Sequence, residues 1–262
     1  ATLVSSVLGK VTSELNIDDI QNQQNLAGDL VIEKIELTNL RPFIASLEQL
    51  TGEIKGRLAI AGTLKEPLLN GDFDVEKINL EGATLPVSLQ NSYVNIAFNN
   101  QSATLKGELK DAEGGALDLS GGIDWQQELP DVDVRLNGKE FFVRAQQDVT
   151  FKVSPDLTMS LKDNAFNLDG QVVVPWGRIA IEELPEGAVQ VSDDEVIVDI
   201  EQQQSEKVPV DYALNLQVLV ENDVRVDSFG LQANVEGDIH IRTCLLYTSD
   251  AGHSNHGVCE RR

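Results

Sequence analysis

The sequence predicts an all-β protein built on one long, curled, mainly meander β-sheet with one short helix. Apolar residues recur at every second position through most of the chain, a period that fits strands and that a helix would not tolerate. Gly, Pro, Asn and Asp bound the alternating segments, as expected for turns between strands. No helix alternates with these segments, so a doubly wound α/β fold is excluded.

The alternation is clearest in residues 171–200, QVVVPWGRIAIEELPEGAVQVSDDEVIVDI. Val172 and Val174 run into Pro175, which cannot donate to a ladder and is expected to close a strand. An LPEG turn at 184–187 and an SDD break at 192–194 divide the remainder into further strands. This stretch is therefore predicted to be a strand meander.

With the strands of that stretch included, the same parity predicts about fifteen strands over the whole chain, most of five to eight residues. Before the helix they are 7–17 and 30–37, and after it 52–62, 69–75, 94–98, 103–109, 117–125, 132–138, 149–153, 157–161, 166–174, 208–220 and 229–241.

One segment, residues 39–52, has helical rather than strand spacing. Thr38 or Asn39 can cap it, Pro42 falls in its first turn, and Gly52 follows its end. Its apolar residues Phe43, Ile44, Leu47 and Leu50 form one stripe, which we expect to lie against the sheet or to plug one end of a groove. One helix cannot cover a sheet of this size.

Glycine recurs on the apolar parity of the strands, where it removes bulk and lets the sheet curl. These glycines are Gly52, Gly56, Gly71, Gly107, Gly121, Gly138, Gly170 and Gly237. A sheet with one apolar face must bury that face against a second sheet, by closure, or against a ligand.

Charge excludes several classes of protein. The 262 residues include 20 Lys plus Arg against 43 Asp plus Glu, a net charge of −23, so nucleic acid is not an expected partner. No apolar run approaches the ~20 residues that span a bilayer. The chain begins mid-pattern with ATLVSS, so we expect a fragment of a longer protein.

The C-terminal tail offers a tempting metal site. Cys244, His253, His256 and Cys259 are potential zinc ligands, but their spacing matches no standard finger and the alternation stops at Thr243. LLYTSDA resembles a translated sequencing adapter, and we expect residues 244–262 to be a non-native tail.

Catalytic groups are not predicted. Acid pairs such as Asp72 with Asp74 or Asp131 with Asp133 share a strand face, which could serve glycoside chemistry or calcium, but no basic partner recurs beside them. Ser and Thr have no histidine partner before the tail except His240, which lies on the polar parity, so a Ser–His–Asp triad is excluded. Trp125 and Trp176 end apolar runs, and rim or core packing suits them as well as ligand contact. No enzyme, metal or cofactor is expected.

Three stretches resemble the C-terminal region of the TamB family, which includes AsmA-like proteins. They are the Pro-ended strand with its LP turn and SDD strand (171–200), GEIKGRLAIAGTLKEPLLNGDF (52–73) and ENDVRVDSFGLQANVEGDIHIR (221–242). The resemblance covers most of residues 28–243. It implies that residues 1–243 form a U-shaped, taco-like β-groove that carries phospholipid between the inner and outer membranes and supports outer-membrane biogenesis. It further implies a periplasmic location, an inner-membrane anchor elsewhere in the protein, and a TamA-like, Omp85-type barrel as partner.

Parity combined with this resemblance identifies the expected lipid-groove lining. The candidates are Ile54, Leu58, Ile60, Phe73, Leu105, Leu117, Leu136, Phe166, Val172, Val210, Leu214, Leu216 and Val218. The alternatives are a structural or adhesive β-helix or sandwich of an autotransporter-like surface protein, and a secreted polysaccharide-acting enzyme. The first would show a strict repeat of about twenty residues with Asn ladders, and the second convergent carboxylates with basic partners. Neither pattern is found in the sequence.

Overall fold

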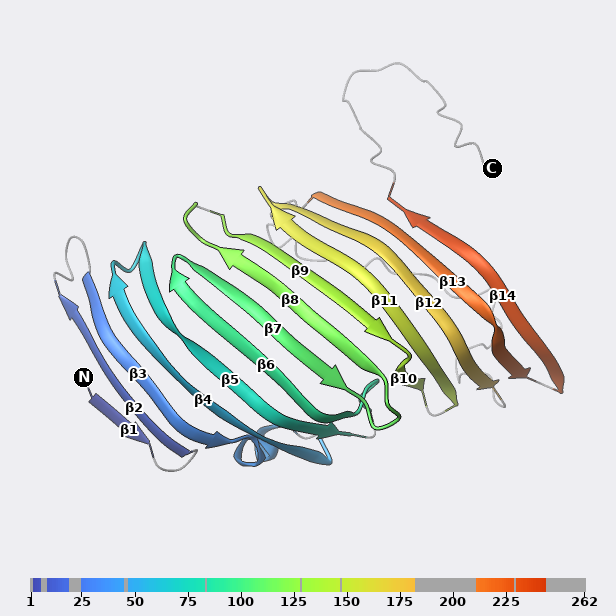
Figure 1. Cartoon of the computed structure of the whole chain (residues 1–262), viewed down its shortest axis with the longest axis horizontal. Coiled ribbons are helices and arrows are strands. Elements are labelled where there is room, and N and C mark those ends of the chain that lie inside the picture. The colour runs from blue at the N-terminus through green and yellow to red at the C-terminus, as the bar shows by residue number, and fades with distance from the viewer. Residues whose placement is uncertain are drawn as a thin grey trace, which may run out of the picture.

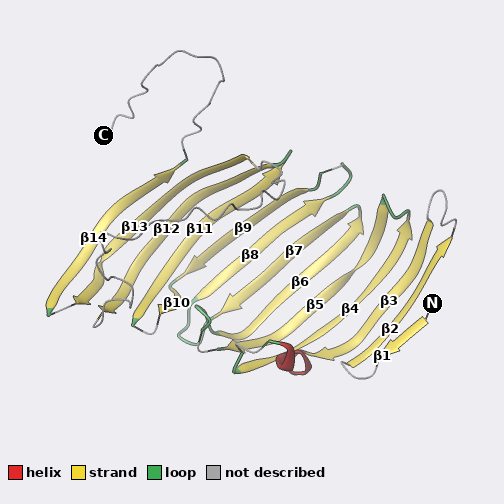
Figure 2. Cartoon of the chain, turned by 180° about the vertical axis from the view of Figure 1, so that it is seen from behind, coloured by secondary structure: helices red, strands yellow, loops and turns green. Residues whose placement is uncertain are grey.

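The computed structural model describes residues 2–5, 9–18, 25–44, 47–82, 84–127, 129–146, 148–181, 211–228 and 230–243. These residues form one 14-stranded sheet (Figures 1 and 2). Its elements are β1 (Thr2–Ser5), β2 (Gly9–Asp18), β3 (Asn25–Glu36), the 3₁₀ helix η1 (Leu37–Phe43), β4 (Gln49–Gly62), β5 (Pro67–Glu81), β6 (Leu89–Asn100), β7 (Ser102–Lys110), β8 (Ala116–Asp124), β9 (Asp131–Lys139), β10 (Phe141–Gln146), β11 (Val149–Lys162), β12 (Ala165–Ile181), β13 (Asp211–Ser228) and β14 (Leu231–Arg242).

The predicted all-β meander is confirmed. Strands follow one another in the order β1 to β9, then β11 to β14, and nearly every neighbouring pair is antiparallel. The exception is β13, which lies parallel to β12 after a connection outside the described residues. The strands expected in 189–200, and Val208 to Val210 of the strand expected at 208–220, lie in that connection.

Two strand limits expected from the sequence are wrong, and each lies at a proline. Pro175 does not end a strand, because β12 runs through it to Ile181, and Pro155 lies inside β11 where two separate strands were predicted. Pro175 sits where the registers with both β11 and β13 shift, and Pro155 faces the gap between β9 and β10. Each proline therefore occupies a place where the ladder is already interrupted and a missing N–H costs little.

The predicted helix at residues 39–52 is wrong in type and extent. The chain forms the short 3₁₀ helix η1 at Leu37–Phe43, and Gln49 already begins β4. Leu50 therefore alternates with Gly52 and Ile54 as a strand residue, and Ile44 is exposed. Leu37 packs on the sheet, where its Cδ1 lies over Gly52. The side chain of Phe43, part of the predicted stripe, lies outside the described ones. Among the described residues there is no α-helix.

The sheet bends along a line near the end where η1 lies (Figure 2). Register shifts occur at that end in β3–β4, β4–β5, β5–β6, β11–β12, β12–β13 and β13–β14. Between β9 and β10 the strand is interrupted at Glu140, which has a φ of 48°. The sequence did not predict β10. Bulges bend strands and increase their twist, and the lower ends of β11–β14 recede from the viewer in Figure 1.

Tight packing is concentrated at this bend. The most buried large side chain is Phe141, which is 2% exposed. Other buried apolar residues at the same end are Leu37, Leu50, Leu117, Val174 and Val224. Buried Asp111 ties the β7–β8 turn to β10, because its Oδ1 accepts bonds from the N–H groups of Glu113 and Gly115 and its Oδ2 from that of Phe142.

Candidate functional site

One face of the sheet, here called the inner face, is built from three neighbouring rows of paired residues. The middle row is Val11, Ile32, Gly56, Phe73, Ile96, Leu105, Gly121, Val134, Met159, Leu168 and Leu214. The lower row, nearer the bend, is Ile35, Ile54, Val75, Val94, Gly107, Leu119, Leu136, Leu157, Gly170, Leu216 and Ile241. The upper row is Ser13, Leu30, Leu58, Gly71, Phe98, Ala103, Ile123, Val132, Leu161, Phe166 and Tyr212. None of these residues carries a charge.

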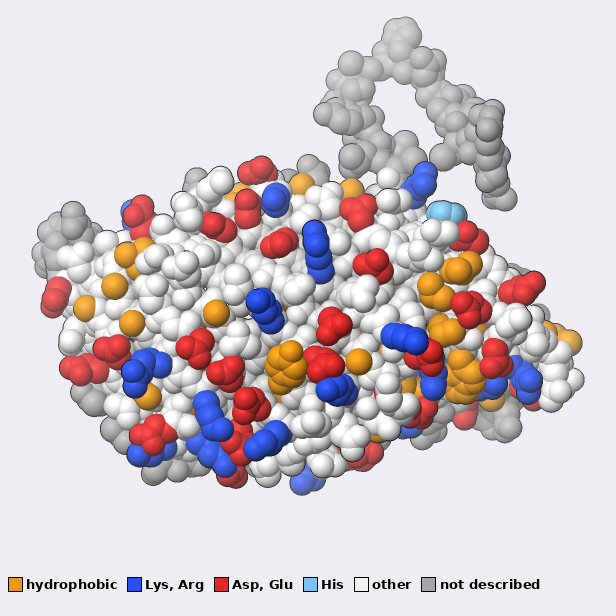
Figure 3. Space-filling model, viewed as in Figure 1, with side chains coloured by type: hydrophobic (Ala, Val, Ile, Leu, Met, Phe, Trp, Pro, Cys, Tyr) orange, Lys and Arg blue, Asp and Glu red, His pale blue; other side chains and the backbone are white. Residues whose placement is uncertain are grey.

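The opposite, outer face is polar along the same strands. Its row between the middle and lower rows reads Lys55, Asp74, Asn95, Lys106, Ser120, Arg135, Thr158, Asp169, Asn215 and Arg242. Figure 3 shows acidic and basic side chains spread across one face of the molecule, with smaller groups of apolar side chains among them. Strand side chains alternate strictly between faces, so a shift of one residue along the chain changes the surface from apolar to polar.

The inner face stays smooth because large side chains lie over glycines on neighbouring strands. The ring of Phe73 covers Gly56, where an added Cβ would come within 2.2 Å of its Cδ1. Leu117 covers Gly138 in the same way, and Phe151 covers Gly177. Two of the glycines that predicted a curled sheet, Gly56 and Gly138, therefore make room for the side chains of their neighbours.

No second layer covers the inner face within the described part of the chain. Each strand makes its substantial contacts with its sheet neighbours, and the substantial contacts of η1 are with β4 and β3 at one end. Most residues of the three rows are half-buried, and Ile123 and Ile241 are 37% and 44% exposed. A two-sheet sandwich is therefore not formed by these residues.

The predicted groove-lining residues, except Val210, share the inner face. Ile54, Leu136 and Leu216 lie in the lower row, Phe73, Leu105 and Leu214 in the middle row, and Leu58 and Phe166 in the upper row. Register extends the same face to Ile60, Leu117, Val172 and Val218. Val210 lies outside the described residues. Whether these side chains contact lipid stays a prediction.

Several inner-face residues were not named from the sequence, among them Ile96, Val134, Met159 and Leu168. The alternation that identified their neighbours was sufficient to find them, because each lies at the apolar parity of its strand. Phe141 and Val143 could not be assigned to the sheet in this way, since β10 itself was missed.

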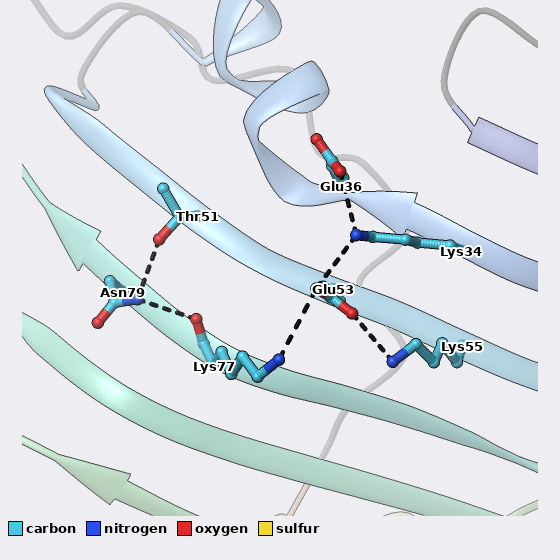
Figure 4. A network of polar contacts seen from close by, with 7 residues as sticks. All are labelled: Lys34, Glu36, Thr51, Glu53, Lys55, Lys77 and Asn79. Carbon is cyan, nitrogen blue, oxygen red and sulfur yellow. Dashed lines mark hydrogen bonds and ion pairs between the residues drawn. The ribbon is translucent and has the colours of Figure 1, made fainter.

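An ion-pair network lies on the outer face at the bend (Figure 4). Glu53 Oε2 lies 2.9 Å from Lys55 Nζ, and Glu53 Oε1 lies 3.2 Å from Lys34 Nζ and 3.9 Å from Lys77 Nζ. Hydrogen bonds from Lys55 and Lys34 lower the pKa of the Glu53 carboxyl from 4.5 to about 2. Bonds to Glu36 and Glu53 raise the pKa of Lys34. The network links three strands beside their register shifts, and it has no catalytic geometry.

The other candidates from the sequence do not converge on a site. Trp125 donates from Nε1 to the Pro67 carbonyl at 3.1 Å, and Trp176 packs between Phe142 and Arg178, so both have structural contacts. His240 is exposed on the polar face, as predicted.

No group of three or more potential metal-ligating side chains occurs in the described residues. The four tail ligands and the proposed adapter-derived segment lie outside them, so those hypotheses stay predictions. No described helix is long and apolar enough to cross a membrane.

These features define a class: an open, all-β protein that presents a broad charge-free surface not covered by a layer of its own described residues. Family comparison identifies the member of that class. Residues 104–245, more than half of the chain, match the family model for the TamB C-terminal domain, and residues 1–75 match the model for the TamB N-terminal domain. The chain therefore belongs to the TamB family.

A curated relative supports this assignment. The Haemophilus influenzae protein "Translocation and assembly module subunit TamB" is 28% identical over 246 residues, which are 89% of this chain and 19% of that protein. The chain thus spans about one fifth of the relative's length. No solved structure matches the chain.

Proposed function

We propose that the inner face carries phospholipid acyl chains between the inner and outer membranes, in support of outer-membrane biogenesis. The observation that carries this proposal is the charge-free surface of three rows, which crosses the sheet from β2 to β13 with no second layer of described residues over it. The predicted lining residues, including Val210, are proposed to contact the lipid.

The energetics favour a continuous surface over isolated pockets. Transferring an acyl chain of about sixteen carbons from a bilayer into water costs ~13 kcal/mol at ~0.8 kcal/mol per CH₂. A surface of Leu, Ile, Val and Phe side chains replaces the hydrocarbon environment and offsets most of that cost. Because the surface continues from strand to strand, a chain could move along it without crossing water.

This function requires no covalent chemistry, so we propose a carrier and not an enzyme. A charged side chain on the inner face would lose its hydration when cargo covered it, at a cost in free energy. The three rows avoid this cost because they contain no charged residue. The charged outer face, within a chain of net charge −23, keeps a long apolar sheet soluble, and the negative net charge repels anionic headgroups.

The cellular setting is proposed from family membership. The relative's name assigns it to a translocation and assembly module. We infer a periplasmic location, an anchor in the inner membrane supplied by another part of the protein, and a TamA-like, Omp85-type barrel as the outer-membrane partner.

Site-specific photo-crosslinking on β13 tests the proposal. A photoreactive residue at Leu214, Leu216 or Val218 is expected to capture phospholipid when the chain is produced in the envelope of a Gram-negative cell. The matched positions Ala213, Asn215 and Gln217 alternate onto the outer face and should capture none. Equal capture at both sets would overturn the proposal.

A further inference from the structure

The inner face contains a hollow of about 270 Å³ over β6–β9 that differs in its lining from four other hollows of the described sheet. Its lining is Ile96, Ala103, Thr104, Leu105, Gly122, Ile123, Val132 and Val134. Four other hollows each include Asp or Glu side chains, whereas this one includes no charged residue.

Two small residues in adjoining rows lie at this space: Ala103 is part of its lining, and Gly121 is next to the lining residue Gly122. Ala103 stands between Phe98 and Ile123 in the upper row, and Gly121 stands between Leu105 and Val134 in the middle row. A Cβ at Gly121 would lie 2.4 Å from the Asp133 carbonyl oxygen, so the close approach of β8 and β9 requires glycine there. The hollow is therefore built into the pairing of these strands.

We propose that this hollow is a seat for a single acyl chain, a fixed binding position on the apolar surface. The inference rests on the proposed lipid-carrying function and adds to it a location and a ligand shape. A dry apolar cavity of about 150 Å³ accommodates benzene, so the larger hollow has room for a segment of hydrocarbon chain.

Shape and charge together select the occupant. The lining comes from four consecutive strands, which at ~4.8 Å per strand spacing gives a length of about 14 Å across the sheet. A long, narrow, uncharged site suits an extended hydrocarbon chain lying across the strands, along the direction in which the rows run. Ile123 is 37% exposed, which leaves the hollow open for entry from the inner side.

A phospholipid with a diazirine in its acyl chain tests the seat. The purified chain is incubated with vesicles containing this lipid, irradiated, and the crosslinked residues are mapped by mass spectrometry. Crosslinks are expected to concentrate on the hollow's lining in β6–β9.

Ile123→Trp should fill the hollow and reduce crosslinking there at least fivefold. Ile239→Trp introduces the same ring at another exposed inner-face position and should leave crosslinking at the hollow unchanged. Ile123→Ala should also retain crosslinking at the hollow.

The outcomes separate the seat from the general function. Crosslinks spread evenly over the inner face, or unaffected by Ile123→Trp, would eliminate the seat while leaving a lipid-carrying surface. Crosslinks confined to the outer face, or none at all, would also remove the proposed function on which the seat rests.

Discussion

An arginine placed on the inner face should distinguish an open apolar surface from a closed core. Leu216 is half-buried and lies in the lower row between Gly170 and Ile241. Full burial of a Leu side chain contributes ~1.5–3 kcal/mol, so a half-buried one contributes roughly 0.75–1.5 kcal/mol. In Leu216→Arg the arginine stem keeps part of that contact while the guanidinium reaches water past exposed Ile241, so the free energy of unfolding should fall by only about 1 kcal/mol.

The measurement is urea denaturation of the parent chain, Leu216→Arg and the outer-face control Gln217→Arg. The control adds the same charge one residue away and should change stability by less than about 0.5 kcal/mol. Lipid capture should be lost in Leu216→Arg and retained in the control. A loss of more than about 3 kcal/mol in Leu216→Arg would indicate an unpaired charge buried in a closed core, and would refute the open-surface reasoning.

Three further predictions concern the bend and the outer face. Phe141→Ala should lower the free energy of unfolding by ~3–5 kcal/mol, because the ring is 2% exposed. The control Tyr93→Ala, at a residue that is 46% exposed, should lower it by under about 1 kcal/mol. Similar losses for the two variants in chemical denaturation would contradict a core at the bend. Asp111→Ala should lower the free energy of unfolding by about 2–4 kcal/mol, because three N–H groups lose their acceptor. Hydrogen exchange at those three amides should accelerate, and unchanged exchange would contradict the role of Asp111 in tying the turn to β10. The Glu53 carboxyl has a lowered pKa in the folded chain, so its contribution to the free energy of unfolding is complete above about pH 4.5 and is lost as pH falls toward about 2. In Glu53→Gln the free energy of unfolding should therefore depend less on pH over that window. Identical pH profiles of the parent and the variant would show that the network does not stabilise the fold.

The sequence alone determined the sheet and its two faces. A side-chain period of two assigns each residue of a strand to one face, and this period survives any choice of neighbouring strand. For that reason Phe73, Leu105 and Leu214 could be placed on one surface before any pairing was known. The charge-free surface was predictable because it is a property of parity.

The tertiary structure decided where strands begin, break and bend. Pro155 and Pro175 end strands by local rules, yet both lie within strands because the neighbouring ladders are interrupted beside them. Leu50 fits a helical stripe with Phe43 and Leu47, but its pairing with Leu80 of β5 makes it a strand residue. Local propensity is a weak preference, and the ladder of a neighbouring strand overrides it.

The hollow over β6–β9 also depended on tertiary structure. The alternation of side chains predicts that Ala103 and Gly121 face inward. Their positions in adjoining rows follow from the register of the strands, which is set by pairing between distant residues. The same holds for the parallel pairing of β13 with β12 and for the shared end at which the bulges lie. The sequence by itself determined what the inner surface is made of, whereas its curvature and the apolar hollow over β6–β9 arise from contacts between residues far apart in the chain.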